Sequence, residues 1–219
     1  MQLRREKEST IAQLKMDLSN RIFYSVCLAS SVLGSIYMGS IYKFFLVNII
    51  CFLAYAEIYH MKLKDNVHSL CIVSLSIFNI SVSLMTTEVL LTFLSIVWST
   101  DIASYAVGNL IGGTKLYVSI SPNKTISGVI GGLAFGMFSL PGLHKYLSLI
   151  MPLKYLGPPA CFYIALLAIV GDLCESGIKR MCGLKDSNLV GIKIPGHGGI
   201  LDRIDALILS APLAFLLMK

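Results

Sequence analysis

Residues 88–107 read EVLLTFLSIVWSTDIASYAV, an apolar run that holds Asp101 well inside it. A helix of about 20 apolar residues crosses a hydrocarbon core about 30 Å thick. Similar runs recur along the chain, and we place them at 22–42, 44–61, 69–86, 126–150, 156–175 and 204–218. Pro141 is expected to interrupt the run at 126–150. The sequence therefore predicts an all-α, polytopic membrane protein with about seven transmembrane helices.

The composition supports a membrane protein. The 219 residues are 55% hydrophobic and 14% charged, whereas a soluble domain carries about 25% charged residues. The net charge of +6 is divided among short segments, so no basic face for a nucleic acid is predicted. The six cysteines form no CxxC pair, which indicates neither a disulfide framework nor a zinc site. We interpret residues 1–219 as one membrane domain, with residues 1–20 as a cytosolic lead-in helix that lies on the membrane or packs locally.

The distribution of lysine and arginine predicts the orientation. All but four of these 18 residues lie on the same side of the predicted spans as the N-terminus. The four exceptions are Lys43, Lys145, Lys154 and Lys219. Cytosolic loops carry the excess of positive charge. We therefore expect the polar segments 108–125 and 176–203 to face the cytosol. The membrane that we expect is the inner membrane of a bacterium.

An acidic side chain inside a predicted span is a functional candidate. Charged groups are costly within a membrane, so those that occur there usually serve a function. At helical spacing, Asp101, Ser104, Tyr105 and Gly108 share one face. The alternative is that Asp101 is a buried carboxylate satisfied by a neighbouring helix.

The segment Ser121-Pro-Asn-Lys124-Thr125 comes directly before the run at 126–150. Hydroxyl groups and a lysine at a helix N-terminus supply donors and positive charge for a phosphate. The segment lacks the glycine spacing of a Walker loop. Its alternative interpretation is a simple helix cap with a solvated lysine.

Polar residues follow the run at 156–175. Asp172 and Ser176 are four residues apart, so they share a helical face and offer two oxygen ligands to a hard cation. Further along come Lys179, Arg180, a glycine-rich turn that contains His197, Asp202, Arg203 and Asp205. Carboxylates, cations and a glycine-rich turn on one membrane face suit metal-assisted chemistry on phosphates. The alternatives are a solvated charge run at 179–186 and a histidine that only orients the turn.

These segments resemble the phosphatidate cytidylyltransferase (CDP-diacylglycerol synthase) family. The C-terminal resemblance consists of Ser176-x-x-Lys179-Arg180, Lys185-Asp186 and Pro195-Gly196-His197-Gly198-Gly199-Ile-Leu-Asp202-Arg203-Ile204-Asp205. The upstream motifs are Trp98-x-x-Asp101-x-x-x-Tyr105-x-x-Gly108 and Ser121-Pro-x-Lys124-Thr125-x-x-Gly128. The resemblance covers residues 90–210, and the segment between Asp186 and Pro195 is longer than is usual in the family.

The resemblance implies an activity, ligands and site residues. It implies Mg²⁺-dependent synthesis of CDP-diacylglycerol from CTP and phosphatidate by an all-helical, often dimeric membrane enzyme, with a monovalent cation such as K⁺ as a further cofactor. The implied metal ligands are Asp172, Asp202 and Ser176. The implied catalytic residues are Lys124, Asp172, Lys179, Arg180 and Asp202, and the implied CTP-binding residues are Ser121, Thr125, His197, Gly198, Gly199 and Arg203.

Two other functions fit part of the same pattern. A related CTP-dependent lipid kinase or transferase would share the phosphate-binding residues. A membrane transporter would also carry carboxylates inside its helices. The transporter predicts charges near the midplane of several helices, whereas here most lie at one cytosolic edge.

Overall fold

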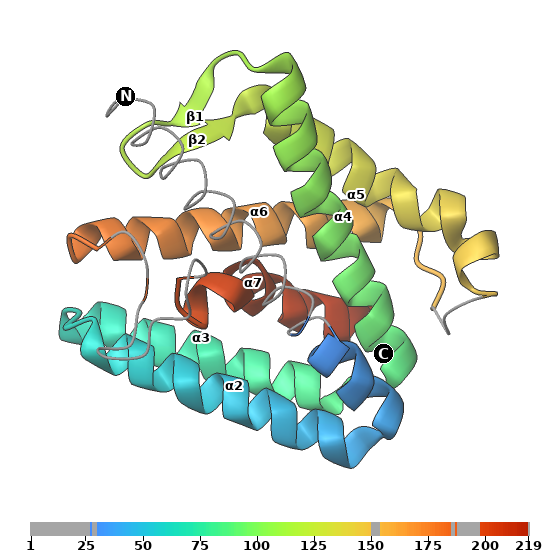
Figure 1. Cartoon of the computed structure of the whole chain (residues 1–219), viewed down its shortest axis with the longest axis horizontal. Helices are drawn as coiled ribbons and strands as arrows, with labels where there is room; N and C mark the ends of the chain where they lie inside the picture. Colours follow the sequence, from blue (N-terminus) through green and yellow to red (C-terminus); the bar gives the residue numbers. More distant parts are fainter. Residues whose placement is uncertain (1–26, 28–29, 150–153, 185–186, 188–197, 219) are drawn as a thin grey trace, which may run out of the picture.

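The computed structural model describes residues 27, 30–149, 154–184, 187 and 198–218, and the chain there is mostly helical. A helical segment at 30–38 precedes the named elements, which Figure 1 labels. In chain order these are α2 (Ser40–His60), α3 (Asp65–Leu84), α4 (Thr87–Ile111), β1 (Lys115–Tyr117), β2 (Ser121–Thr125), α5 (Ile126–Leu147), α6 (Pro158–Met181) and α7 (Leu201–Met218).

Within the described part of the chain, four helices, α2, α3, α4 and α6, are long and apolar enough to cross a membrane. They coincide with the predicted runs at 44–61, 69–86, 88–107 and 156–175. The chain is therefore a membrane protein. Helices α5 and α7 fall on the other two predicted runs beyond residue 108, which confirms them as helices, and their passage across the membrane stays a prediction.

Three details of the predicted helices were wrong. The break before α2 lies at Gly39, whose φ of 117° favours glycine, and not near residue 43. Lys43, expected in an outer loop, is buried inside α2, where its ammonium group donates to the backbone oxygen of Met85. Pro141 does not end α5, which continues to Leu147.

The expectation of an all-α fold was wrong between α4 and α5. Strands β1 and β2 form an antiparallel hairpin there, in which Lys115 lies opposite Thr125 and Tyr117 opposite Ser121. The strands have only 3 and 5 residues, so they are too short to show the apolar alternation that identifies a strand from sequence. Because β2 runs directly into α5, the hairpin fixes where that helix begins.

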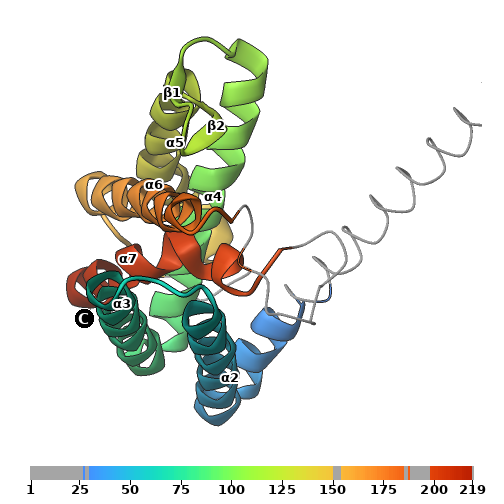
Figure 2. The ribbon, with the colours of Figure 1, turned by 90° about the vertical axis from the view of Figure 1, so that its left-hand side faces the viewer.

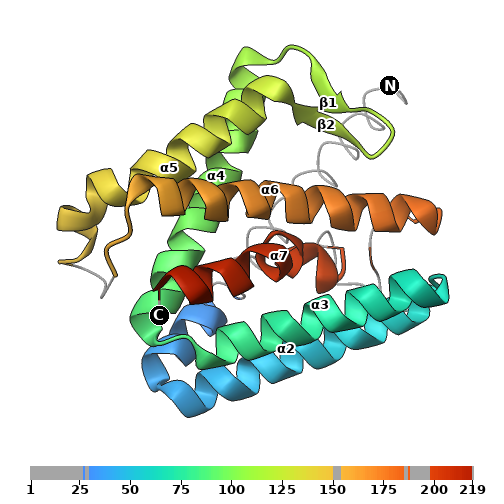
Figure 3. The same ribbon diagram turned by 180° about the vertical axis from the view of Figure 1, so that it is seen from behind.

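Helix α7 lies between α6 on one side and the antiparallel pair α2 and α3 on the other (Figures 1 and 3). Figure 2 shows α2, α3 and α6 nearly end-on, with the hairpin and α5 on the side of α6 that faces away from α7. The last turns of α2 and α6 and the first turns of α3 and α7 meet at one end of the molecule. Polar segments that are far apart in the sequence therefore come together at this end.

Small residues allow the helices around this end to approach closely. On α5, a Cβ added at Gly128 would lie 2.6 Å from the backbone oxygen of Ser104 on α4. On α6, a Cβ at Gly171 would lie 2.7 Å from the backbone oxygen of Asp205 on α7. The first contact brings the end of the hairpin against α4, and the second places Asp172 beside α7.

We expect Gly128→Ala to lower the free energy of unfolding by about 1–3 kcal/mol, because the added methyl group meets backbone and not a movable side chain. The measurement is the thermal unfolding midpoint in detergent. Gly34→Ala is the matched control, since a Cβ there has no atom within 4 Å. Equal midpoints for the two variants would contradict the close packing of α4 and α5.

Candidate active site

A polar cavity of about 510 Å³ lies between α4, the hairpin, α5 and α6. Asp101, Ser104 and Tyr105 of α4 line one wall, so the prediction that they share a face is confirmed. Lys124 at the end of β2 and Asp172 on α6 line the opposite side. The cavity thus unites three motifs that are separated in the sequence.

Lys124 and Asp172 form an ion pair in this cavity. Their side chains are 27% and 29% exposed, so both remain within reach of a ligand. Ser176 Oγ donates to the other oxygen of Asp172 at 3.4 Å. The predicted shared face of Asp172 and Ser176 is therefore confirmed, and it adjoins the predicted phosphate-binding lysine.

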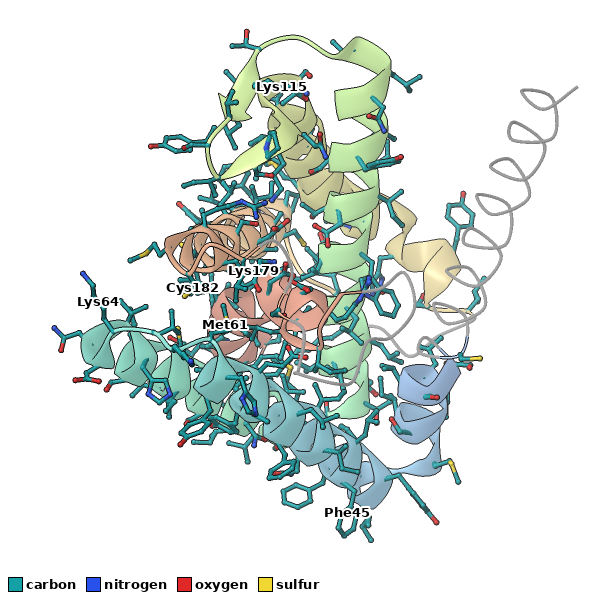
Figure 4. All side chains as sticks on the ribbon, turned by 60° about the vertical axis from the view of Figure 1, so that its left-hand side comes forward. Phe45, Met61, Lys64, Lys115, Lys179 and Cys182 are labelled. Carbon is teal, nitrogen blue, oxygen red and sulfur yellow. The ribbon has the colours of Figure 1, made fainter. Side chains whose placement is uncertain are left out.

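A second, more deeply buried cluster joins α6 to α7. Lys179 is buried and forms ion pairs with Glu175 on its own helix and with Asp202 on α7. Figure 4 shows Lys179 between α6 and the start of α7. A buried ammonium group requires partners of opposite charge, so this cluster fixes the relative position of the two helix ends.

Asp202 accepts hydrogen bonds from the backbone in addition to its ion pair with Lys179. Its Oδ2 accepts hydrogen bonds from the backbone N–H groups of Gly199 at 2.7 Å and Ser187 at 3.1 Å. Burial acts to raise the pKa of Asp202, but the hydrogen bonds from Lys179 and these backbone groups lower it below its ordinary value. Asp202 is therefore a carboxylate at neutral pH.

The glycine turn is built around this carboxylate. Gly198 has a φ of 66°, which favours glycine, and a Cβ at Gly199 would collide with the backbone oxygen of Ser187. We predicted that Gly198 and Gly199 contact CTP. In the structure their immediate role is to let the backbone close on Asp202.

The two predicted arginines lie apart from the polar cavity. Arg180 is exposed and donates through Nε to the backbone oxygen of Ile120 at 3.3 Å and through Nη1 to that of Leu184 at 2.8 Å. It therefore ties the end of α6 to the turn of the hairpin. Arg203 is also exposed and lines a different, apolar cavity.

The predicted CTP-binding hydroxyl groups lie on β2. Ser121 is paired with Tyr117 in the hairpin. Thr125 lines the cavity, but its hydroxyl accepts from the N–H of Gly128 at 3.1 Å and caps α5, which confirms the helix-cap alternative for this residue. His197 lies outside the described residues, as do Lys185 and Asp186.

Sequence reasoning missed two charged residues of the site. Lys115 on β1 lines the cavity with Lys124. Glu175 is buried, and its Oε1 has no hydrogen-bond partner in the part of the chain that the structure describes. The ion pair of Glu175 with Lys179 could have been predicted, because the two residues are four apart on a helix. The position of Lys115 could not, because it depends on the hairpin.

The donor set fits a divalent cation of the Mg²⁺ type. Asp172, Ser176, Glu175 and Asp202 offer oxygen donors, and the unpartnered oxygen of Glu175 is a buried polar atom of the kind that a cation satisfies. Among the described residues, no three acidic, histidine or cysteine side chains form a ready-made cage. Mg²⁺ commonly binds through one or two carboxylates together with waters and substrate phosphates.

Comparison with known proteins places these residues in a family. The sequence pattern of the cytidylyltransferase family matches residues 85–219, which is more than half of the chain. The chain belongs to the cytidylyltransferase family. The match includes the hairpin, α6 and α7, and with them both lysine–aspartate pairs.

Two proteins that are similar to this chain carry the same, more specific name. The chain is 43% identical over 122 residues to the phosphatidate cytidylyltransferase of Brucella suis biovar 1, a match that covers 56% of this chain and 43% of that protein. It is 40% identical over 130 residues to the phosphatidate cytidylyltransferase of Staphylococcus epidermidis (strain RP62A), covering 59% and 48%. The chain spans about half the length of the curated relatives it matches.

Proposed function

We propose that this chain is a phosphatidate cytidylyltransferase, which converts CTP and phosphatidate to CDP-diacylglycerol and pyrophosphate. The observation that carries the proposal is the ion pair of Lys124 with Asp172 in the polar cavity of a membrane protein, together with the buried ion pair of Lys179 with Asp202, which α6 and α7 supply. Cations and carboxylates so arranged can hold phosphates and a metal ion together. The names of the similar proteins support this substrate pair.

The reaction requires positioning more than covalent chemistry by the protein. A phosphate oxygen of phosphatidate forms a bond to the α-phosphorus of CTP, and the bond from that phosphorus to the bridging oxygen breaks. The electron pair leaves with pyrophosphate, so no serine or cysteine is modified. Lys124 and Lys179 hold phosphate oxygens and neutralise their charge, which is the main contribution that fixed cations make to phosphoryl-group chemistry.

We propose Asp172 and Asp202, with Ser176 beside the first, as the residues that hold Mg²⁺. When bound, Mg²⁺ supplies charge neutralisation for the phosphate oxygens. The resemblance to the family adds K⁺ as a second cation and a homodimer as the assembly. Size-exclusion chromatography with light scattering measures the latter directly.

We also propose about seven transmembrane helices in a bacterial inner membrane, with the end that carries the hairpin in the cytosol, where CTP is present. The orientation follows from the excess of lysine and arginine on that side. The charged residues gather around one cavity and one helix junction, which favours an enzyme over a transporter.

Purified protein incubated with CTP, phosphatidate and Mg²⁺ tests the proposal. We expect mass spectrometry to detect CDP-diacylglycerol, and a coupled assay to detect one pyrophosphate for each product molecule. Chelation of Mg²⁺ should stop the reaction, and added Mg²⁺ should restore it. Absence of CDP-diacylglycerol under these conditions would refute the assignment.

We expect Lys124→Ala to lower kcat/KM for CTP about 10- to 100-fold, the loss that corresponds to one charge-assisted hydrogen bond. Lys124→Arg should recover only part of it, because a guanidinium group differs in shape and reach from an ammonium group. Lys64→Ala is the control, since Lys64 is exposed just before α3 and lies away from the cavity (Figure 4). Normal use of CTP by Lys124→Ala would show that Lys124 is only a structural partner of Asp172.

A further inference from the structure

Glu57, on α2, is a buried carboxylate far from Asp202 in the sequence. Only 3% of the residue is exposed. Its two oxygens accept three hydrogen bonds, from Ile200 N at 2.7 Å, Leu201 N at 2.8 Å and Ser187 Oγ at 3.0 Å. All three donors belong to the segments that surround Asp202.

The first contact of Glu57 is with the beginning of α7. The first N–H groups of a helix have no partners within the helix, and the helix dipole favours a negative charge there. For α7 this negative charge is the carboxylate of Glu57, which belongs to another helix. The last turn of α2 lies near the start of α7 at the same end of the molecule (Figures 1 and 4). Glu57 therefore fixes the first turn of α7, which contains Asp202, against a separate transmembrane helix.

The second contact of Glu57 reaches Asp202 through one intermediate residue. Ser187 donates its hydroxyl to Glu57 and its backbone N–H to Asp202 Oδ2 at 3.1 Å. The other oxygen of Asp202 pairs with Lys179. A continuous chain of contacts thus links Glu57 to Asp202 and then to Lys179, in the buried cluster between α6 and α7 and not in the lining of the polar cavity.

We propose that Glu57 is a positioning residue, which holds Asp202 and Lys179 in the geometry that the reaction requires. The inference rests on the proposed cytidylyltransferase function. Glu57 lies outside residues 85–219, the part that matches the family. Helix α2 would then help to position active-site residues, in addition to anchoring the chain in the membrane.

The test is Glu57→Gln in the full chain. Glutamine keeps the size of the side chain but replaces one acceptor oxygen with an NH₂ group, which cannot accept a hydrogen bond from the three donors. We expect kcat to fall about 10-fold and the Mg²⁺ concentration for half-maximal rate to rise, as is usual when a residue that orients a metal ligand is changed. Glu57→Asp, which keeps both oxygens, should recover part of the loss.

A second measurement does not depend on activity. Hydrogen–deuterium exchange should become faster in peptides that cover residues 198–206 of Glu57→Gln, because Ile200 and Leu201 donate to different oxygens of Glu57 and glutamine keeps only one of them. Thr92→Val is the matched control. It removes buried hydrogen bonds between the Thr92 hydroxyl and the backbone of Glu88 and Lys154, near the start of α4 and away from residues 198–206. It should lower stability while leaving kcat, the Mg²⁺ requirement and exchange at 198–206 unchanged.

The outcomes separate this inference from the proposed function. Unchanged exchange at 198–206 in Glu57→Gln would overturn the anchoring role, whether or not the protein is active. Faster exchange with a kcat and an Mg²⁺ requirement equal to those of an active wild type would overturn the catalytic consequence. An inactive wild type would overturn the proposed function instead, and with it the catalytic part of the inference.

Discussion

Asp172→Asn is expected to reduce kcat by about 100-fold or more, the scale on which preorganised charge contributes to catalysis. Asp172 lines the polar cavity, forms an ion pair with Lys124 and accepts a hydrogen bond from the hydroxyl of Ser176. Asparagine keeps the volume of the side chain but removes the charge, so the proposed Mg²⁺ site loses a ligand and Lys124 loses its partner. The measurement is the initial rate of CDP-diacylglycerol formation over a range of Mg²⁺ concentrations.

Asp65→Asn is the matched control for this change. Asp65 is an exposed carboxylate in the first turn of α3, at the same end of the molecule. Its loss removes an equal charge and should leave kcat near that of the wild type. Near wild-type turnover of Asp172→Asn at limiting Mg²⁺ would remove Asp172 from the proposed metal site.

Asp202→Asn is expected to cause a loss of similar size, about 100-fold in kcat, and also to lower the unfolding temperature. The carboxylate accepts from Lys179 and from the backbone of Gly199 and Ser187. An amide offers a single acceptor oxygen and no charge, so at least one of these donors loses its contact with residue 202. The first measurement compares kcat and the thermal unfolding midpoint of the variant with those of the wild type.

A double-mutant cycle with Lys179→Met measures how strongly the effect of Asp202 on kcat depends on Lys179. Because the two side chains are in contact, the effects of the single changes on kcat should not add in the double variant. Additive effects would show that the pair does not act as a unit. Retention of wild-type kcat by Asp202→Asn alone would exclude Asp202 as a metal ligand.

Much of the fold could be predicted from the sequence, because membrane helices are identified by local composition. The runs at 44–61, 69–86, 88–107 and 156–175 became α2, α3, α4 and α6 with small shifts at their ends. The shared face of Asp172 and Ser176 was predictable for the same reason, since helical spacing alone determines it.

Contacts between distant segments could not be predicted in this way. Glu57 and Leu201 lie on different helices, and no spacing in the sequence relates them. The buried position of Lys43 was missed because it depends on the free backbone oxygen after α3, which only the packed structure supplies. The hairpin was missed because its strands are too short to show a pattern, and the position of Lys115 was missed with it.

The fate of the individual phosphates of CTP tests the central claim most directly. Purified protein is incubated with phosphatidate, Mg²⁺ and CTP labelled on either the α- or the γ-phosphorus, and the lipid is then extracted. A cytidylyltransferase transfers the α-label to the lipid and releases the γ-label as pyrophosphate, which is the result we predict. Transfer of the γ-label to the lipid would identify a kinase, and a lipid without either label would contradict the proposed activity altogether.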